Sequence, residues 1–283
     1  MKRIVCEDSS GNIIEFTYDG TPLRLSDTDG FSAAEYTVNT SQSTGQDGET
    51  YLSSTANKRN PVITVDICSD YQAQRDRLYS FFQPRSEGTI FFYEDASTGR
   101  KAGYYVESIN VEESGSSRQA VISLICPDPK WYALTDDLTQ LAVWQGCIRF
   151  PLRIANPFRV TEKVNTLIGN VRNDSAVPMG LTVTFRATGT VVNPSLYDIN
   201  RQKLMQVNTT MHAGDVIIIT TGDGNKRVKL ISGGVTTNIN NLMKYPPEWL
   251  QAYQGDNLFR YNADSGIDSL SVSILSTQAY WGA

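Results

Sequence analysis

Apolar and polar residues alternate with a period of two along most of the chain, and this pattern predicts β-strands. Strands and turn residues follow one another at spacings of about 8 to 12 residues, which is typical of sandwiches and barrels. The predicted fold class is therefore mainly β, with two β-sandwich-like domains. The predicted antiparallel pairs are 102–112 with 117–126, 181–188 with 191–199, and 215–221 with 226–231.

One segment follows a helical period instead. Its apolar residues fall on one face of a helix: Tyr71, Leu78, Phe81 and Phe82. Asp70 offers N-cap chemistry and Pro84 prevents continuation, so the sequence predicts one amphipathic helix over about 70–82. Its apolar face is expected to pack on the sheet of the first domain.

The pattern also suggests where the domains divide. The chain has 283 residues, enough for two domains at about 150 residues each. Pro127 and Pro129 stop a strand, and periodicity is lost beyond them. We therefore expect a first domain over 1–132, a connector over 133–160 and a second domain over 161–283.

Composition narrows the classes of partner. The net charge of -5 has the wrong sign for a surface that neutralises phosphates, so nucleic acid is not an expected partner. The longest aliphatic run, 216–219, is far too short to cross a bilayer, so no membrane partner is expected either. The N-terminus lacks the apolar core of a signal peptide. Four scattered cysteines fit thiols kept in a reducing cytoplasm: Cys6, Cys68, Cys126 and Cys147.

No residue pattern predicts catalysis. His212 is the only histidine, and no nucleophile motif such as GxSxG accompanies the serines. One histidine and four separated cysteines offer no ligand pair at metal spacing, and nothing selects two of the many carboxylates as a glycosidase pair. We expect no enzyme activity, no catalytic residue, no cofactor and no metal.

Two features suggest surfaces for binding. The polar stretch 39–60 is too long for an idle loop in a compact domain. Aromatic residues are concentrated toward the C-terminus, where exposed rings would suit stacking on sugars or anchoring a protein interface: Tyr245, Trp249, Tyr253, Tyr261, Tyr280 and Trp281. The alternative is that most of them fill a sandwich core.

Several motifs in order resemble one known family. These are the segment 44–51 (TGQDGETY), Lys58-Arg59 before the strand 62–67, the aromatic strand 90–93, and 127–132 (PDPKWY). With a closing 280–282 (YWG), they resemble the distal tail proteins of phages with long, non-contractile tails that infect mainly Gram-positive bacteria. The resemblance covers nearly the whole chain.

This resemblance implies an architecture and a role. Such proteins form a hexameric ring through their N-terminal domains, continue the tail tube, and carry a galectin-like C-terminal sandwich. The ring is an adaptor in the distal tail of the virion, assembled in the host cytoplasm. The implied partners are other copies of the chain, the tail tube protein, a tail-associated lysin or tail-tip protein of the baseplate, and, as a further candidate, a receptor-binding protein.

The resemblance and the polar stretch together suggest interface residues. We expect 39–60 to be an arm ordered by a neighbouring subunit. Contacts with its own domain are too few to offset the conformational entropy that the segment loses when it is ordered. The expected interface residues are Thr44, Gly45, Gln46, Asp47, Gly48, Thr50, Tyr51 and Arg59. The alternative is a carbohydrate-binding module for host cell-wall glycans, with Trp249 and Tyr253 as contacts for a glycan or a partner.

Overall fold

The computed structural model describes residues 2–95, 98–114, 117–146, 161–165 and 167–283. The chain separates into two compact units, Met1–Leu134 together with Ala279–Ala283, and Thr135–Gln278. The expected division differs in two respects: residues 135–146 of the expected connector belong to the second unit, and the last five residues return to the first unit. They do so because β26 (Ala279–Tyr280) pairs with β10 (Trp131–Ala133). Residues 147–160 of the expected connector lie outside the described residues.

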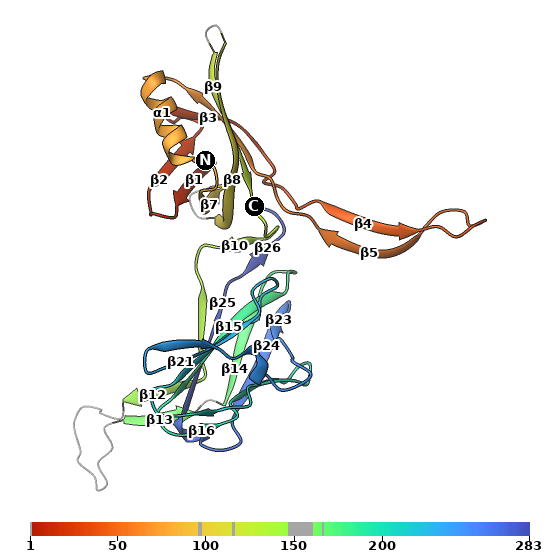
Figure 1. Ribbon diagram of the computed structural model, residues 1–283, viewed down its shortest axis with the longest axis vertical. Helices are drawn as coiled ribbons and strands as arrows, with labels where there is room; N and C mark the ends of the chain where they lie inside the picture. Colours follow the sequence, from red (N-terminus) through yellow and green to blue (C-terminus); the bar gives the residue numbers. More distant parts are fainter. Residues whose placement is uncertain (1, 96–97, 115–116, 147–160, 166) are drawn as a thin grey trace. The chain divides into compact units, whose positions relative to one another are not determined.

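The sheet of the first unit closes into a barrel. The strand β8 (Gly99–Ser114) pairs through residues 99–105 with β7 and through residues 105–114 with β9, which joins the two ends of the sheet (Figure 1). The other strands of the ring are β7 (Glu87–Tyr93), β1 (Arg3–Asp8), β2 (Ile13–Thr17), β3 (Leu23–Asp29), β6 (Val62–Ile67) and β9 (Ser117–Ile125). The sheet closes because β8 is long enough to pair with both neighbours, and the predicted mainly β fold class is confirmed.

Alternating side chains of these strands fill the barrel. Ile4 on β1, Phe16 on β2 and Ile63 on β6 are fully buried, as the period of two predicts. The predicted helix is confirmed as α1 (Tyr71–Phe81), with Leu78 as its buried residue. Phe82 follows α1 and stacks on Phe16, with 6.4 Å between the ring centroids.

The start of α1 differs from the predicted cap. Asp70 adopts a left-handed conformation with φ 49°, and its side chain makes no capping hydrogen bond. An N-cap residue needs an extended backbone to aim its oxygen at the first helical N–H groups, so Asp70 cannot serve. The helix is held by the packing of Leu78 and Phe82 instead.

The second unit is a sandwich of two antiparallel sheets. One sheet has the order β11 (Asp137–Gln140), β25 (Leu270–Ser276), β15 (Met179–Ala187), β20 (Val216–Thr220), β21 (Arg227–Ser232) and β22 (Val235–Asn238), with β23 (Gln251–Ala252) paired to β15. The other has the order β14 (Ile168–Asn173), β24 (Gly255–Asn262), β17 (Ser195–Asp198) and β18 (Lys203–Gln206). Phe185 from the first sheet and Phe259 from the second are both fully buried in one shared core.

Short elements complete the second unit. They are the pair β12 (Ala142–Gly146) with β13 (Thr161–Asn165), the pair β16 (Val191–Val192) with β19 (Thr210–Met211), and the 3-10 turns η1 (Asn240–Leu242) and η2 (Ile267–Ser269). Among the described residues, the helical segments are all too short to cross a membrane.

Two of the three predicted antiparallel pairs are confirmed. They are β8 with β9 and β20 with β21. The third is wrong, because β15 pairs with β20 and β25 while β17 pairs with β18 and β24 in the other sheet. Between these two strands, Asn193 at φ 53° and Pro194, which lacks an N–H, lie where the chain crosses to the facing sheet.

Candidate functional site

A two-stranded ribbon projects from the first unit. β4 (Tyr36–Ser41) and β5 (Thr50–Ala56) pair with each other and with no other described strand (Figure 1). Residues 36–55 are all exposed except the half-buried Gln46. A lone two-stranded ribbon is at best marginally stable in water, so this ribbon gains stability when another surface covers it. We call β4, β5 and their connecting loop the arm.

The tip of the arm contains five of the expected interface residues. Thr44, Gly45, Gln46, Asp47 and Gly48 lie together in the loop, and Thr50 and Tyr51 begin β5. Gly45 and Gly48 have φ values of +81° and +78°, which glycine adopts without strain.

The side chain of Gln46 organises this tip. Its Nε2 donates to Thr50 Oγ1 at 3.1 Å, and its Oε1 accepts from the Ser43 N–H at 3.3 Å. Its backbone carbonyl accepts from Gln42 Nε2 at 3.0 Å. These three hydrogen bonds hold the loop in one shape.

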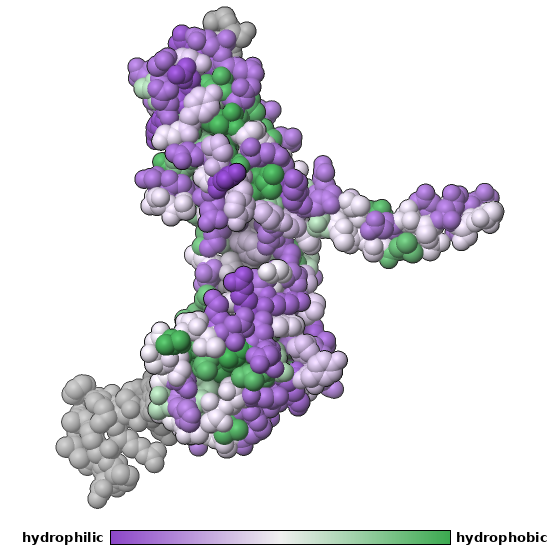
Figure 2. Space-filling model, viewed as in Figure 1, coloured by the Kyte–Doolittle hydropathy of each residue, from purple (hydrophilic) through white to green (hydrophobic). Residues whose placement is uncertain are grey.

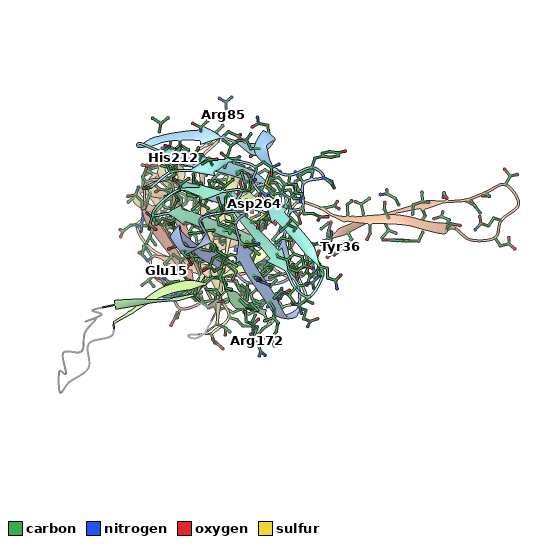
Figure 3. All side chains as sticks on the ribbon, turned by 90° about the horizontal axis from the view of Figure 1, so that it is seen from below. Glu15, Tyr36, Arg85, Arg172, His212 and Asp264 are labelled. Atoms are coloured by element: carbon green, nitrogen blue, oxygen red, sulfur yellow. The ribbon has the colours of Figure 1, made fainter. Side chains whose placement is uncertain are left out.

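Four large apolar side chains lie on the surface of the arm. They are Tyr36, Val38, Tyr51 and Leu52, and the last two are each 61% exposed. Figure 2 shows apolar surface along the arm among polar residues, and Figure 3 shows Tyr36 at its base. Leu52 is the extra residue of a bulge, because Ser53 pairs with Asn39 and Tyr51 pairs with Thr40. These exposed apolar side chains make the arm a candidate surface for protein contact.

The sequence pattern pointed to the tip but missed three of these apolar residues. Tyr36 and Val38 precede the stretch 39–60, and that stretch was expected to be a loop rather than part of two strands. The signal was present, since β-branched and aromatic residues such as Thr37, Val38 and Tyr51 favour strands.

Arg59 does not lie with the tip. It is 4% exposed and sits inside the first unit, where its guanidinium donates to backbone carbonyl oxygens. Nε and Nη2 donate to Pro129 at 3.2 and 2.8 Å, Nη2 also donates to Trp281 at 2.6 Å, and Nη1 donates to Gly30 at 3.0 Å and to Ser32. Burial lowers the pKa of Arg59. Its role is to join chain segments within the unit.

The two expected contacts in the second unit differ in exposure. Trp249 is half-buried and packs against the sandwich core. Tyr253 is 40% exposed, but the Arg201 guanidinium lies 3.9 Å from its ring centroid. Tyr245, at 90% exposure, is the most accessible of the predicted aromatic residues.

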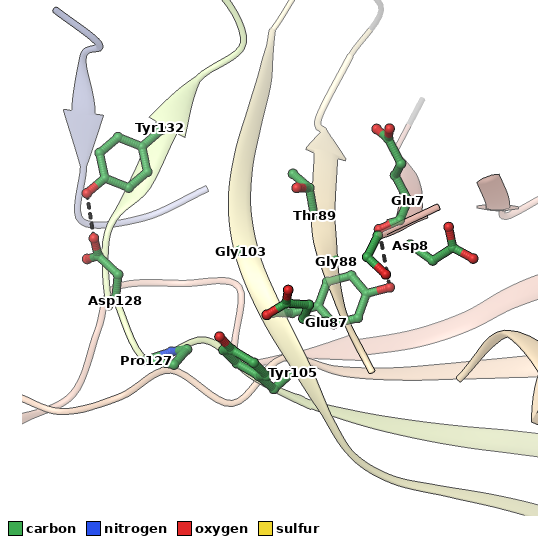
Figure 4. Close-up of a pocket in the computed structure, with 12 residues that line it drawn as sticks. Glu7, Asp8, Glu87, Gly88, Thr89, Gly103, Tyr105, Pro127, Asp128 and Tyr132 are labelled. Carbon is green, nitrogen blue, oxygen red and sulfur yellow. Dashed lines mark hydrogen bonds between the residues drawn. The ribbon is translucent and has the colours of Figure 1, made fainter. Parts of the chain in front are cut away.

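A hollow of about 540 Å³ opens on the first unit, with carboxylates at its rim (Figure 4). Several of its side chains are engaged locally. Asp8 accepts hydrogen bonds from Asn12 and Ser10, which lower its pKa, and Asp128 accepts from Tyr132 Oη at 2.5 Å. Tyr104 Oη donates to the Glu7 carbonyl at 3.5 Å. These contacts stabilise turns and strand ends.

The described residues contain no cluster of side chains suited to hold a metal ion. No group of three His, Cys, Asp or Glu side chains gathers among them, and His212 lies exposed in a turn where its N–H donates to Asp215 at 2.8 Å. Burial raises the pKa of the Cys126 thiol to about 12, so it is protonated at neutral pH. Cys6 is buried likewise, Cys68 is exposed, and Cys147 lies outside the described residues.

Comparison with known proteins gives one family match. Residues 16–126 match the family of the Phage tail protein RIFT-related domain. This segment includes the arm and all barrel strands except β1 and most of β2. No curated protein sequence matches the chain.

Solved structures share the fold along the whole chain. The SPP1 Dit protein, described as a paradigm of the hub adsorption apparatus in Gram-positive-infecting phages, has a TM-score of 0.67 at 11% identity, with 99% of each chain covered. The phage P2 baseplate in its activated conformation with Ca has a TM-score of 0.54 at 9% identity, covering 100% of this chain and 99% of that chain. The same baseplate with Sr gives 0.53 at 10% identity, with 100% of both chains covered. The resemblance expected from the sequence is therefore confirmed at the level of the fold.

Proposed function

We propose that this chain, whose residues 16–126 form a phage tail protein RIFT-related domain, is a distal tail protein. In this role it is a structural component of the tail rather than an enzyme. Six copies form a ring that continues the tail tube and joins it to the tail-tip or baseplate proteins. The fold shared with a phage hub protein and with phage baseplates supports this role.

The observation that carries the proposal is the arm. It presents Tyr36, Val38, Tyr51 and Leu52 to solvent and has no partner strand among the described residues. A second copy of the chain is the partner proposed here, because a ring gives each arm one identical neighbour to cover it. Burial of these side chains then offsets the entropy of holding the arm in one conformation.

The remaining partners follow from the role. One face of the ring would contact the tail tube protein, and the other a tail-tip protein, a tail-associated lysin or a receptor-binding protein. The protein would be made in the host cytoplasm and would reside at the distal end of the tail.

Deletion of residues 43–52 tests the role of the arm. The deletion leaves the Asn39–Ser53 pair closed by Thr40, Ser41 and Gln42, a length that suits a hairpin loop. None of the removed residues belongs to the barrel, so the barrel should stay folded. We expect the variant to be a folded single chain under conditions in which the full chain is a hexamer. A hexamer formed by the deleted protein would contradict the proposal.

Carbohydrate binding is the second candidate function. The observation in its favour is Tyr253, whose ring is partly exposed beside the Arg201 guanidinium in the second unit. A sugar would stack on the ring face opposite the guanidinium, whose Nη1 already donates to Asp198 at 3.4 Å and to Asn257 at 3.1 Å. A glycan array with the full chain and with Tyr253→Ala tests it, and equal signals from the two would contradict it.

A further inference from the structure

The last five residues of the chain lie against the root of the arm. The root is the segment 30–35, which connects β3 to β4. The Ala283 N–H donates to the Phe31 carbonyl at 3.1 Å. Gly282 lies beside this segment, where an added methyl group would make an ordinary contact at 3.7 Å from the Ala33 nitrogen. The C-terminal segment therefore covers the backbone from which the arm departs.

Arg59 ties the same segments together from inside. One guanidinium donates to Gly30 and Ser32 at the root, to Pro129 before β10, and to Trp281 in the C-terminal segment. Arg59 itself follows β5 by three residues, and its backbone pairs with Cys126. Because the guanidinium is a planar fork with fixed donor directions, it holds these carbonyls in one geometry.

An aromatic contact reaches the first residue of the arm. The Trp281 and Tyr36 rings meet edge-on, with centroids 5.5 Å apart. Across the root, the Asn57 N–H donates to the Glu35 carbonyl at 2.9 Å and closes the base of the ribbon. Both strands of the arm are thus anchored where the C-terminal segment is docked.

Two further contacts hold the C-terminal segment itself. The Arg100 guanidinium lies 4.0 Å from the Tyr280 ring centroid and donates to the Gly282 carbonyl. The strand β26 pairs with β10 through Trp131 and Tyr132. The segment is therefore bound by backbone pairing, by two arginines and by ring contacts.

We propose that residues 279–283 act as a latch that fixes the direction of the arm. This inference rests on the proposed function, since the arm is the surface that would meet the neighbouring copy. The latch follows the second unit in the chain, because β26 begins directly after Gln278. The geometry of the arm therefore depends on a segment that is synthesised after the second unit.

Hydrogen exchange at the root tests the latch. The background is the 43–52 deletion, which keeps the root and removes the tip, so that assembly does not itself protect the amides. Trp281→Leu removes the contact with Tyr36, and truncation after Gln278 removes the whole latch. Tyr245→Leu is the matched control, an exposed tyrosine of the second unit. Exchange of the Asn57 amide is the readout, with the amides of β1 as the reference for an intact barrel.

With the latch removed, we expect exchange at Asn57 to rise about tenfold or more while β1 amides and the control stay unchanged. Unchanged exchange at Asn57 in Trp281→Leu, with an intact barrel, would overturn the latch. If the truncation also raises exchange of the β1 amides, the barrel is no longer intact, and the result with Trp281→Leu alone tests the latch. The readout does not depend on ring formation, so failure of the full chain to form a hexamer would count against the proposed function and not against the latch.

Discussion

Replacing the two most exposed apolar side chains of the arm tests whether they form the contact between copies. The variant is Tyr51→Ser with Leu52→Ser. Each side chain is 61% exposed, and full burial of a leucine or aromatic side chain is worth about 1.5–3 kcal/mol. Covering the exposed part of both is therefore worth roughly 2–4 kcal/mol per contact. The dissociation constant of each contact should rise roughly 30- to 700-fold in the variant.

The fold of the single chain should hardly change. Tyr51 donates one hydrogen bond to Ser54 at 3.0 Å within the arm, and Leu52 is the unpaired residue of the bulge. Neither belongs to the barrel core. The thermal midpoint of the variant should therefore stay close to that of the parent.

Sedimentation velocity over a range of concentrations measures this effect. The matched control is Val235→Ser on β22 of the second unit, where the valine is 67% exposed and lies outside the arm. We expect the control to assemble as the parent does and the double variant to dissociate at concentrations where the parent is intact. Equal assembly of the double variant and the parent would refute the assignment of these side chains to the interface.

Three further predictions concern stability and reactivity. The hydrogen bond from Arg24 lowers the pKa of Asp66. The stabilisation of the fold by the ionised Asp66 carboxylate is therefore present above the ordinary carboxyl pKa, and it is lost as the pH falls through the lowered pKa. Since the pair is partly exposed, urea melts should show Asp66→Asn less stable by only about 0.5 kcal/mol at pH 7, with no deficit near pH 2. In a Cys147→Ser background, a thiol reagent should label Cys68 within minutes and the two buried thiols only after denaturation, and rapid labelling of all three would contradict their burial. The buried hydroxyl of Tyr261 has no hydrogen-bond partner among the described residues. Tyr261→Phe should therefore leave the free energy of unfolding unchanged or raise it by about 1 kcal/mol. A decrease of more than about 1 kcal/mol in urea melts would contradict this.

Local pattern predicted the elements whose own sequence determines them. The hairpin of β20 and β21 has glycine and polar turn residues at 222–225 between two alternating runs, and α1 has a helical apolar face that ends before Pro84. Closure of the sheet into a barrel could not be predicted from local pattern, because it depends on pairing between strands distant in the sequence, such as β6 and β9. Alternation says that a strand has a buried face but not which strand lies beside it.

The candidate site was predictable only in part. The tip of the arm stands out in the sequence because a long polar stretch is unusual in a compact domain, and its role as an interface stays a prediction. The strands of the arm were missed because neither face of the ribbon is buried, so the apolar alternation that marks a strand is weak there. Arg59 was misplaced because its acceptors are backbone carbonyls at positions 30, 32, 129 and 281, which no side-chain pattern reveals.

The mass of the full chain in solution tests the central claim most directly. Multi-angle light scattering across a range of concentrations should give a species of about six times 31.4 kDa. The same measurement on the 43–52 deletion should give a single chain. A single-chain mass for the full protein at every concentration would contradict assembly of the ring through its own arms.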